Sequence, residues 1–128
     1  MYINEYNSLK WTITIGTVPG YGMSEQERMN EKEFTEKYRT IALEVEEETG
    51  IYISCVFYNS RTVYKTEWGC PEEGELTYTL SGSCNREFSE PDKYCKALKL
   101  LAGKLKAGFE QSTVLLEMVP MEEVYYKG

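Results

Sequence analysis

The spacing of hydrophobic residues in the first part of the chain changes from every second residue to every third or fourth residue. Trp11, Ile13 and Ile15 alternate with threonines, which predicts a half-buried strand over residues 11–15. Four apolar residues then recur at steps of four, three and four, a spacing typical of one stripe of an amphipathic helix. They are Phe34, Tyr38, Ile41 and Val45. The pattern predicts a strand and a helix, joined by a glycine-containing loop at residues 16–22.

Capping residues mark the ends of this first helix. Ser24 with Glu27, and Asn30 with Glu33, each match a capping box, in which side chains satisfy the free backbone N–H groups of a helix start. Gly50 stands where a left-handed C-terminal cap is expected. We therefore expect the helix to begin at one of the two boxes and to end at Gly50.

The middle of the chain predicts three strands. Residues 51–58 are β-branched and aromatic on both faces, which favours a central strand, and Asn59 with Ser60 is a turn signal. Residues 61–68 and 76–81 alternate again, and a segment rich in glycine, proline and glutamate joins them. These three strands are predicted to form an antiparallel meander.

A second helix and a last strand are predicted after the meander. Ser89 suits the N-cap position and Pro91 suits the first helical turn. The apolar stripe of this helix precedes Gly108 and consists of Tyr94, Leu98, Leu101 and Leu105. The apolar run at residues 113–119 is predicted to be a strand that ends at Pro120.

The predicted order of elements is β-α-β-β-β-α-β, an α+β fold with a five-stranded, mainly antiparallel sheet and two helices. Residues 1–128 are expected to form a single domain, with residues 121–128 as a tail or an interface segment. Two helices can cover only one face of such a sheet. The other face is either solvated or used for self-association, and it would carry Thr12, Thr14, Tyr52, Ser54, Tyr58, Thr77 and Thr79.

The composition adds limits to this fold. The chain has 128 residues, of which 41% are apolar, so a hydrophobic core is expected rather than disorder. No window reaches the roughly 18 apolar residues of a membrane helix, and the polar first ten residues do not resemble a signal peptide. A soluble, cytoplasmic protein that does not bind membranes is expected. The net charge of −7 also argues against binding long nucleic acids, which requires a basic stripe.

The inventory of reactive side chains is small. The chain has no histidine and only one aspartate, Asp92, which excludes imidazole catalysis and disfavours paired-aspartate metal sites. The four cysteines contain no C-x-x-C pair, so free thiols are expected rather than a zinc site. We therefore expect a protein that is not an enzyme and needs neither a metal nor a cofactor.

Two strand-to-helix loops carry candidate ligand-binding residues. In the first loop, Gly16, Thr17 and Tyr21, with Arg28 one helical turn later, can surround an anionic ligand, although a plain connecting loop is the alternative. In the second, Asn85 can bind a nucleobase edge or a ribose. Arg86 can bind a phosphate and Phe88 can stack on a base, the alternative being a turn with a solvated arginine and a buried phenylalanine.

Trp68 is a further candidate. It ends the predicted second strand of the meander and precedes a Gly-Cys-Pro turn. A tryptophan at such a position either fills the core or forms one wall of an aromatic slot for a ligand.

Segments at both ends of the chain resemble the first family of Thoeris anti-defence proteins of phages. They are Thr12-Ile13-Thr14-Ile15-Gly16, Lys96-Ala97-Leu98 through Lys104-Leu105, and Gln111-Ser112-Thr113-Val114-Leu115. The resemblance implies a homo-oligomer that sequesters a cyclic ADP-ribose-type signalling nucleotide in the cytoplasm of the infected bacterium without degrading it. It also implies ligand contacts from Arg28, Trp68, Asn85 and Arg86.

Two other functions remain open from the residues themselves. A Glu-rich stretch, residues 44–48, and the negative net charge suit a module that inhibits a host protein by binding it. A glutamate-based nucleotide hydrolase is the third hypothesis, with Glu25, Glu27 and Glu31 as Mg²⁺ ligands at a helix start.

Overall fold

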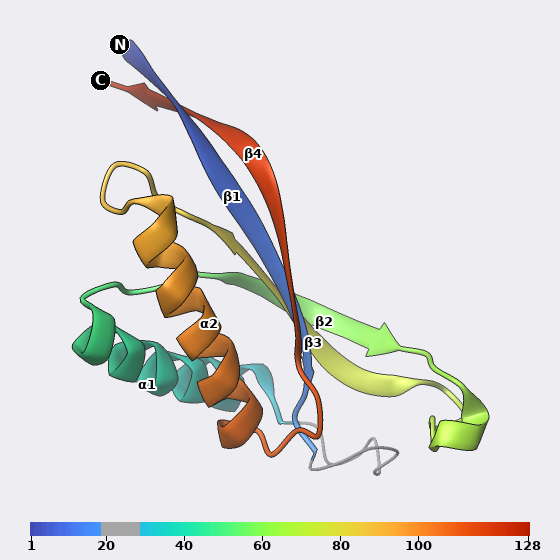
Figure 1. Ribbon diagram of the computed structural model, residues 1–128. Helices are drawn as coiled ribbons and strands as arrows, with labels where there is room; N and C mark the ends of the chain where they lie inside the picture. Colours follow the sequence, from blue (N-terminus) through green and yellow to red (C-terminus); the bar gives the residue numbers. More distant parts are fainter. Residues whose placement is uncertain (19–28) are drawn as a thin grey trace.

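The computed structural model describes residues 1–18 and 29–128. Within them, four strands form one antiparallel sheet in the order β2-β3-β1-β4. Both α-helices lie on one side of the sheet (Figure 1). The elements are β1 (Tyr2–Gly16), α1 (Glu31–Thr49), β2 (Val56–Thr62), the 3₁₀ helix η2 (Thr66–Trp68), β3 (Glu75–Ser83), α2 (Pro91–Gly108) and β4 (Leu115–Lys127). The α+β fold with two helices and an antiparallel sheet is confirmed.

The predicted fifth strand is wrong. The turn expected at Asn59 and Ser60 does not form, because both residues pair with β3, opposite Tyr78 and Thr77. β2 therefore runs through the turn signal, and η2 occupies the end of the segment expected to be a separate strand. Pairing with residues 75–81 of β3 outweighs the weak local preference of two polar residues for a turn.

The two terminal segments form far longer strands than their sequences predict. β1 begins at Tyr2 and pairs with β4 from Tyr2 opposite Lys127 to Thr14 opposite Leu115. Pro120, expected to end the last strand, instead lies opposite Leu9. A proline is tolerated there because β4 is the edge strand of the sheet. Residues 121–127 thus belong to β4, in a two-stranded ribbon that extends beyond the helices (Figure 1).

The core lies between the sheet and the two helices and confirms both predicted apolar stripes. Phe34 stands at its centre, with its ring centroid 4.9 Å from that of Phe57, 4.3 Å from that of Tyr78 and 5.2 Å from that of Phe109. Trp11 is fully buried and donates a hydrogen bond from Nε1 to the hydroxyl of Tyr94 at 2.8 Å. The buried helix residues include Phe34, Tyr38, Ile41, Val45, Tyr94, Leu98, Leu101 and Leu105.

The capping residues position the helices much as expected. Asn30 is the N-cap of α1, and its side chain accepts a hydrogen bond from the backbone N–H of Glu33 at 2.9 Å. Gly50 has φ of 79°, the left-handed conformation expected of a C-cap. The first predicted box, Ser24 with Glu27, lies outside the described residues. α2 begins one residue later than expected, with Glu90 rather than Ser89 at its N-cap.

The sheet face opposite the helices carries a row of hydroxyl groups. Thr77 and Thr79 on β3 are buried there, and Thr14 pairs with Thr79. Ser60 links the row, because its Oγ lies 2.7 Å from Oγ1 of Thr77 and accepts a hydrogen bond from Thr79 at 2.9 Å. Of the other four residues predicted for this face, Thr12 lies in β1 and Tyr58 in β2, whereas Tyr52 and Ser54 precede β2.

Candidate functional site

The structure divides the sequence-predicted ligand residues between the two ends of β3. Gly16, at the end of β1, pairs with Thr77 near the start of β3, whereas Asn85, Arg86 and Phe88 follow the end of β3. The two ends are about 26 Å apart, at roughly 3.3 Å per residue. These residues therefore do not form one site within the chain. Tyr21 and Arg28 lie outside the described residues.

A carboxylate and a tyrosine meet beside Gly16. The hydroxyl of Tyr64 donates a hydrogen bond to Oε1 of Glu75 at 3.0 Å. A Cβ atom added to Gly16 would lie 2.5 Å from Oε2 of Glu75 and 2.9 Å from Oε1 of Gln111. Glycine is thus the residue that leaves room for both polar groups. We call Gly16, Tyr64, Glu75 and Gln111 the strand-end site.

The strand-end site adjoins the row of hydroxyl groups on the open face of the sheet. Glu75 pairs with Thr62, and Oγ1 of Thr62 lies 3.2 Å from Oγ1 of Thr77. A carboxylate next to several hydroxyl groups can bind a ligand that carries a positive charge and hydrogen-bonding groups. Tyr64, Glu75 and Gln111 are not among the predicted site residues, because only the pairing of the strands and the path of the connecting segments bring them to Gly16.

Thr17 has a structural role beside this site. Its Oγ1 accepts a hydrogen bond from the backbone N–H of Met29 at 3.0 Å. The side-chain amide of Gln111 donates to the backbone oxygen of Val18 at 2.9 Å. These two contacts hold Val18 and Met29, the described residues on either side of residues 19–28.

Trp68 lies in η2, beyond the end of β2, so the alternative that it fills the core is wrong. Its side chain is 69% exposed. The ammonium of Lys65 lies 5.9 Å from the ring centroid, at the outer limit of a cation–π contact.

A cleft of about 680 Å³ opens at the other end of β3. Asn85 and Phe88, two of the three ligand contacts predicted in the second loop, line this cleft. Phe88 is 87% exposed, so the alternative of a buried phenylalanine is wrong. The rest of the lining consists of Glu46, residues 50–52, 54–56 and 81–83, Ser89, Tyr94 and Tyr125.

Arg86, the third predicted contact of this loop, makes its contacts outside the cleft. Its Nη1 donates to the backbone oxygen of Asn7, its guanidinium lies 5.3 Å from the ring centroid of Tyr6, and its Nη2 is 4.0 Å from the carboxylate of Glu90. Its Nε is buried and has no hydrogen-bond partner within residues 1–18 and 29–128. These contacts attach the loop after β3 to β1.

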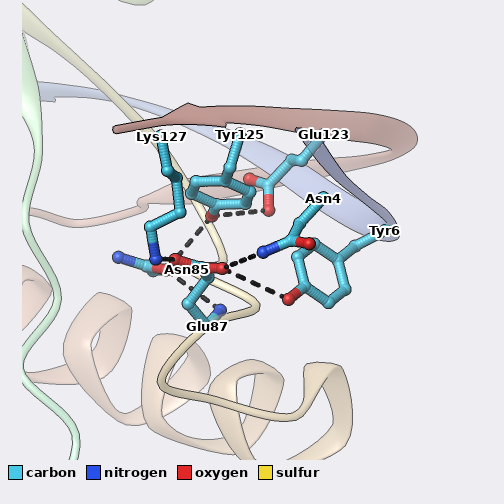
Figure 2. Close-up of polar contacts among 7 residues, drawn as sticks. All are labelled: Asn4, Tyr6, Asn85, Glu87, Glu123, Tyr125 and Lys127. Carbon is cyan, nitrogen blue, oxygen red and sulfur yellow. Dashed lines mark hydrogen bonds and ion pairs between the residues drawn. The ribbon is translucent and has the colours of Figure 1, made fainter. Parts of the chain in front are cut away.

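Glu87 attaches the same loop to both strands of the terminal ribbon (Figure 2). Its Oε2 accepts hydrogen bonds from the amide of Asn4 at 3.1 Å and from the hydroxyl of Tyr6 at 3.3 Å, and its Oε1 pairs with the ammonium of Lys127. The hydrogen bond from Lys127 is the main cause that lowers the pKa of Glu87. No local sequence pattern could have indicated contacts between residues so far apart.

The described residues contain no group of three side chains suited to hold a metal ion. Glu31 is exposed at the start of α1, whereas Glu25 and Glu27 of the predicted Mg²⁺ site lie outside the described residues. The four cysteines are free thiols. No helix in the described part of the chain is long and apolar enough to cross a membrane.

Comparison with known proteins identifies the family. The family model described as SAM lyase matches residues 6–127, so this chain belongs to the SAM lyase family. A structure of a phage SAM lyase in complex with S-methyl-5'-thioadenosine is similar, with a TM-score of 0.59 and 15% identity over 92% of this chain and 87% of that chain. A phage SAM lyase in the apo state has a TM-score of 0.59 and 12% identity, over 94% of each chain. Comparison with curated proteins gave no match.

Family membership corrects three predictions from the sequence. The chain belongs to a family of enzymes, so the expectation of a non-enzyme is wrong. The sequestering function implied by the Thoeris resemblance is contradicted by the SAM lyase match over residues 6–127; the likeness to phage proteins is shared by the two similar structures, but membership of the Thoeris anti-defence family is not shown. The cyclic ADP-ribose-type partner is also wrong, because the similar structure holds S-methyl-5'-thioadenosine instead. The structure of a single chain does not test the expected homo-oligomer.

Proposed function

We propose that this protein cleaves S-adenosylmethionine and releases S-methyl-5'-thioadenosine. The observation that carries the proposal is the SAM lyase family match over residues 6–127. The ligand of the similar phage enzyme supports it, because S-methyl-5'-thioadenosine is what remains when the four-carbon part of methionine leaves S-adenosylmethionine. The phage origin of both similar structures supports action in the cytoplasm of an infected bacterium.

The chemistry of this cleavage suits a chain without histidine. When the bond between the sulfonium and the methionine γ-carbon breaks, both electrons go to sulfur, which leaves as a neutral thioether. No acid is needed to protonate it. A lyase adds no water, so the four-carbon fragment is completed either by losing a proton or by bonding its γ-carbon to its own carboxylate. In both routes the protein contributes mainly by holding the substrate in a reactive conformation.

We place the methionine part of the substrate at the strand-end site, because Glu75 offers a negative charge there. Sulfur loses its positive charge as the bond breaks, so a carboxylate facing sulfur would stabilise the substrate more than the transition state. The α-ammonium group keeps its charge throughout. Glu75 is therefore assigned to the α-ammonium, with the Tyr64 hydroxyl orienting the carboxylate at 3.0 Å. Gly16 provides the space.

The function is tested by incubating the purified protein with an excess of S-adenosylmethionine. Samples are heat-denatured at intervals and the supernatant is separated by liquid chromatography. We expect S-methyl-5'-thioadenosine to accumulate over many turnovers while S-adenosylmethionine disappears. Recovery of all the S-adenosylmethionine intact would contradict the proposal.

Replacing Gly16 with alanine is expected to lower kcat/KM about 10- to 100-fold, because small displacements of positioning groups cost this much. The new Cβ would force the Glu75 carboxylate and the Gln111 amide to move. Both are the ends of flexible side chains, so the melting temperature should change little. Gly103→Ala is the matched control, since nothing lies within 4 Å of its added Cβ. Equal activity of the two variants would remove Gly16 from the site.

A further inference from the structure

The cleft at the far end of β3 has the properties of a small-molecule site. Its volume of about 680 Å³ lies within the usual range for ligand pockets, roughly 300–1,000 Å³. Glu75 of the strand-end site lies six residues along β3 from Ser81 of the cleft, about 20 Å at 3.3 Å per residue. A single molecule of nucleoside size cannot reach both places within one chain.

The lining of the cleft indicates the chemistry of its ligand. Phe88 exposes most of its ring, and Tyr52 is 38% exposed, so aromatic faces are available for stacking. Hydroxyl groups come from Ser54, Ser81 and Ser83. No lysine or arginine is among the lining residues in the described part of the chain, and Glu46 contributes a carboxylate. This combination suits a planar ring with hydroxyl substituents and disfavours a phosphate.

The loop that presents Phe88 is held rigidly. The side-chain oxygen of Asn85 accepts hydrogen bonds from the backbone N–H of Glu87 at 3.1 Å and from the hydroxyl of Tyr125 at 3.1 Å. The backbone N–H of Phe88 donates to the backbone oxygen of Asn85 at 2.9 Å. The same hydroxyl lies 3.0 Å from Oε1 of Glu123, so its single proton is shared between the two acceptors. Burial, followed by the contact with Glu123, raises the pKa of Tyr125 to about 12, so the hydroxyl keeps this proton at neutral pH.

The Phe88 side chain contributes little to the stability of the fold, so the hydrogen bonds that hold its loop are not explained by packing of the ring. An aromatic ring that is 87% exposed contributes almost no burial, yet a network from both termini fixes its backbone. A ring fixed at the edge of a cleft loses little conformational freedom when a ligand stacks on it, and such preorganisation favours binding.

We propose that this cleft binds an uncharged nucleoside, with the base stacked on Phe88 and the ribose hydroxyls facing the serines, at a site separate from the strand-end site. The proposal does not depend on the lyase activity. It predicts that adenosine binds more tightly than adenosine 5'-monophosphate, because the phosphate would find no cation among the lining residues.

The test is an NMR titration of the ¹⁵N-labelled protein with adenosine. The amide signals of Ser83, Asn85 and Phe88, which line the cleft, should shift on titration. Shifts at Gly16 and Glu75 would report separate binding at the strand-end site and do not affect this result. Phe88→Ala should weaken this binding at least about tenfold, the loss expected for removing a base–aromatic stack. The melting temperature and the rate of S-adenosylmethionine cleavage should stay unchanged. Tyr126→Ala, which removes another exposed ring outside the cleft, is the matched control.

Three results would overturn the proposal. They are the absence of shifts at Ser83, Asn85 and Phe88, equal adenosine binding by Phe88→Ala and the unaltered protein, and tighter binding of the monophosphate than of adenosine. Loss of S-adenosylmethionine cleavage in a folded Phe88→Ala variant would also overturn it, since the cleft would then belong to the reacting site. Failure of the unaltered protein to cleave S-adenosylmethionine would contradict only the proposed lyase function.

Discussion

Glu75→Gln is expected to lower kcat/KM for S-adenosylmethionine cleavage about 10- to 100-fold, since a charge-assisted hydrogen bond contributes roughly 1.5–3 kcal/mol. Glutamine keeps the shape of the side chain and an oxygen that can accept the Tyr64 hydroxyl, which lies 3.0 Å from Oε1 of Glu75. Only the negative charge is lost. Because Glu75 is assigned to a group whose charge persists through the reaction, most of the loss should be a higher KM.

The measurement is the initial rate of S-methyl-5'-thioadenosine formation over a range of substrate concentrations. Glu72→Gln is the matched control, because it removes the same charge from an exposed turn before β3. The two variants have the same net charge, so long-range electrostatic effects are similar. If Glu75→Gln retains full activity, the substrate does not use this carboxylate, and the strand-end assignment fails.

Phe34→Ala is expected to lower the free energy of unfolding by about 3–5 kcal/mol, the usual cost of removing a buried aromatic side chain. Phe34 is fully buried and its ring contacts those of Phe57, Tyr78 and Phe109. These three rings come from β2, β3 and the end of α2, so no single element can move to fill the cavity. Urea denaturation followed by circular dichroism measures the change.

Leu43→Ala is the control on the same helix. Leu43 is 50% exposed and lies off the buried stripe, so its loss should change the unfolding free energy by at most about 0.5 kcal/mol. Similar destabilisation by the two variants would mean that α1 does not pack on the sheet through Phe34.

The absence of histidine was a poor guide to function. It excludes mechanisms that need an imidazole, but the family match contradicts the wider conclusion that the chain is not an enzyme. Under the proposed reaction the leaving group is already cationic and departs as a neutral thioether. An enzyme for such a substrate must bind and orient it more than transfer protons. Glutamate, tyrosine and glycine residues can provide this binding and orientation.

Helix prediction succeeded because its signals are local. The stripes through Phe34 and Tyr94, the cap at Asn30 and the left-handed Gly50 each depend on residues within one or two turns. The strands were predicted less well because their partners lie far away in the chain. The segments around Tyr2 and Lys127 were not predicted as strands, yet the two residues pair with each other.

The sequence by itself determined the α+β class, the two amphipathic helices and the apolar residues that fill the core, since periodicity and capping are properties of short segments. Only the tertiary structure decided the number and length of the strands, and which polar residues meet. Glu75 lies beside Gly16, and Glu87 binds Lys127, because strand register and loop path bring distant residues together. Register depends on the pairing of whole strands, which no short stretch of sequence encodes.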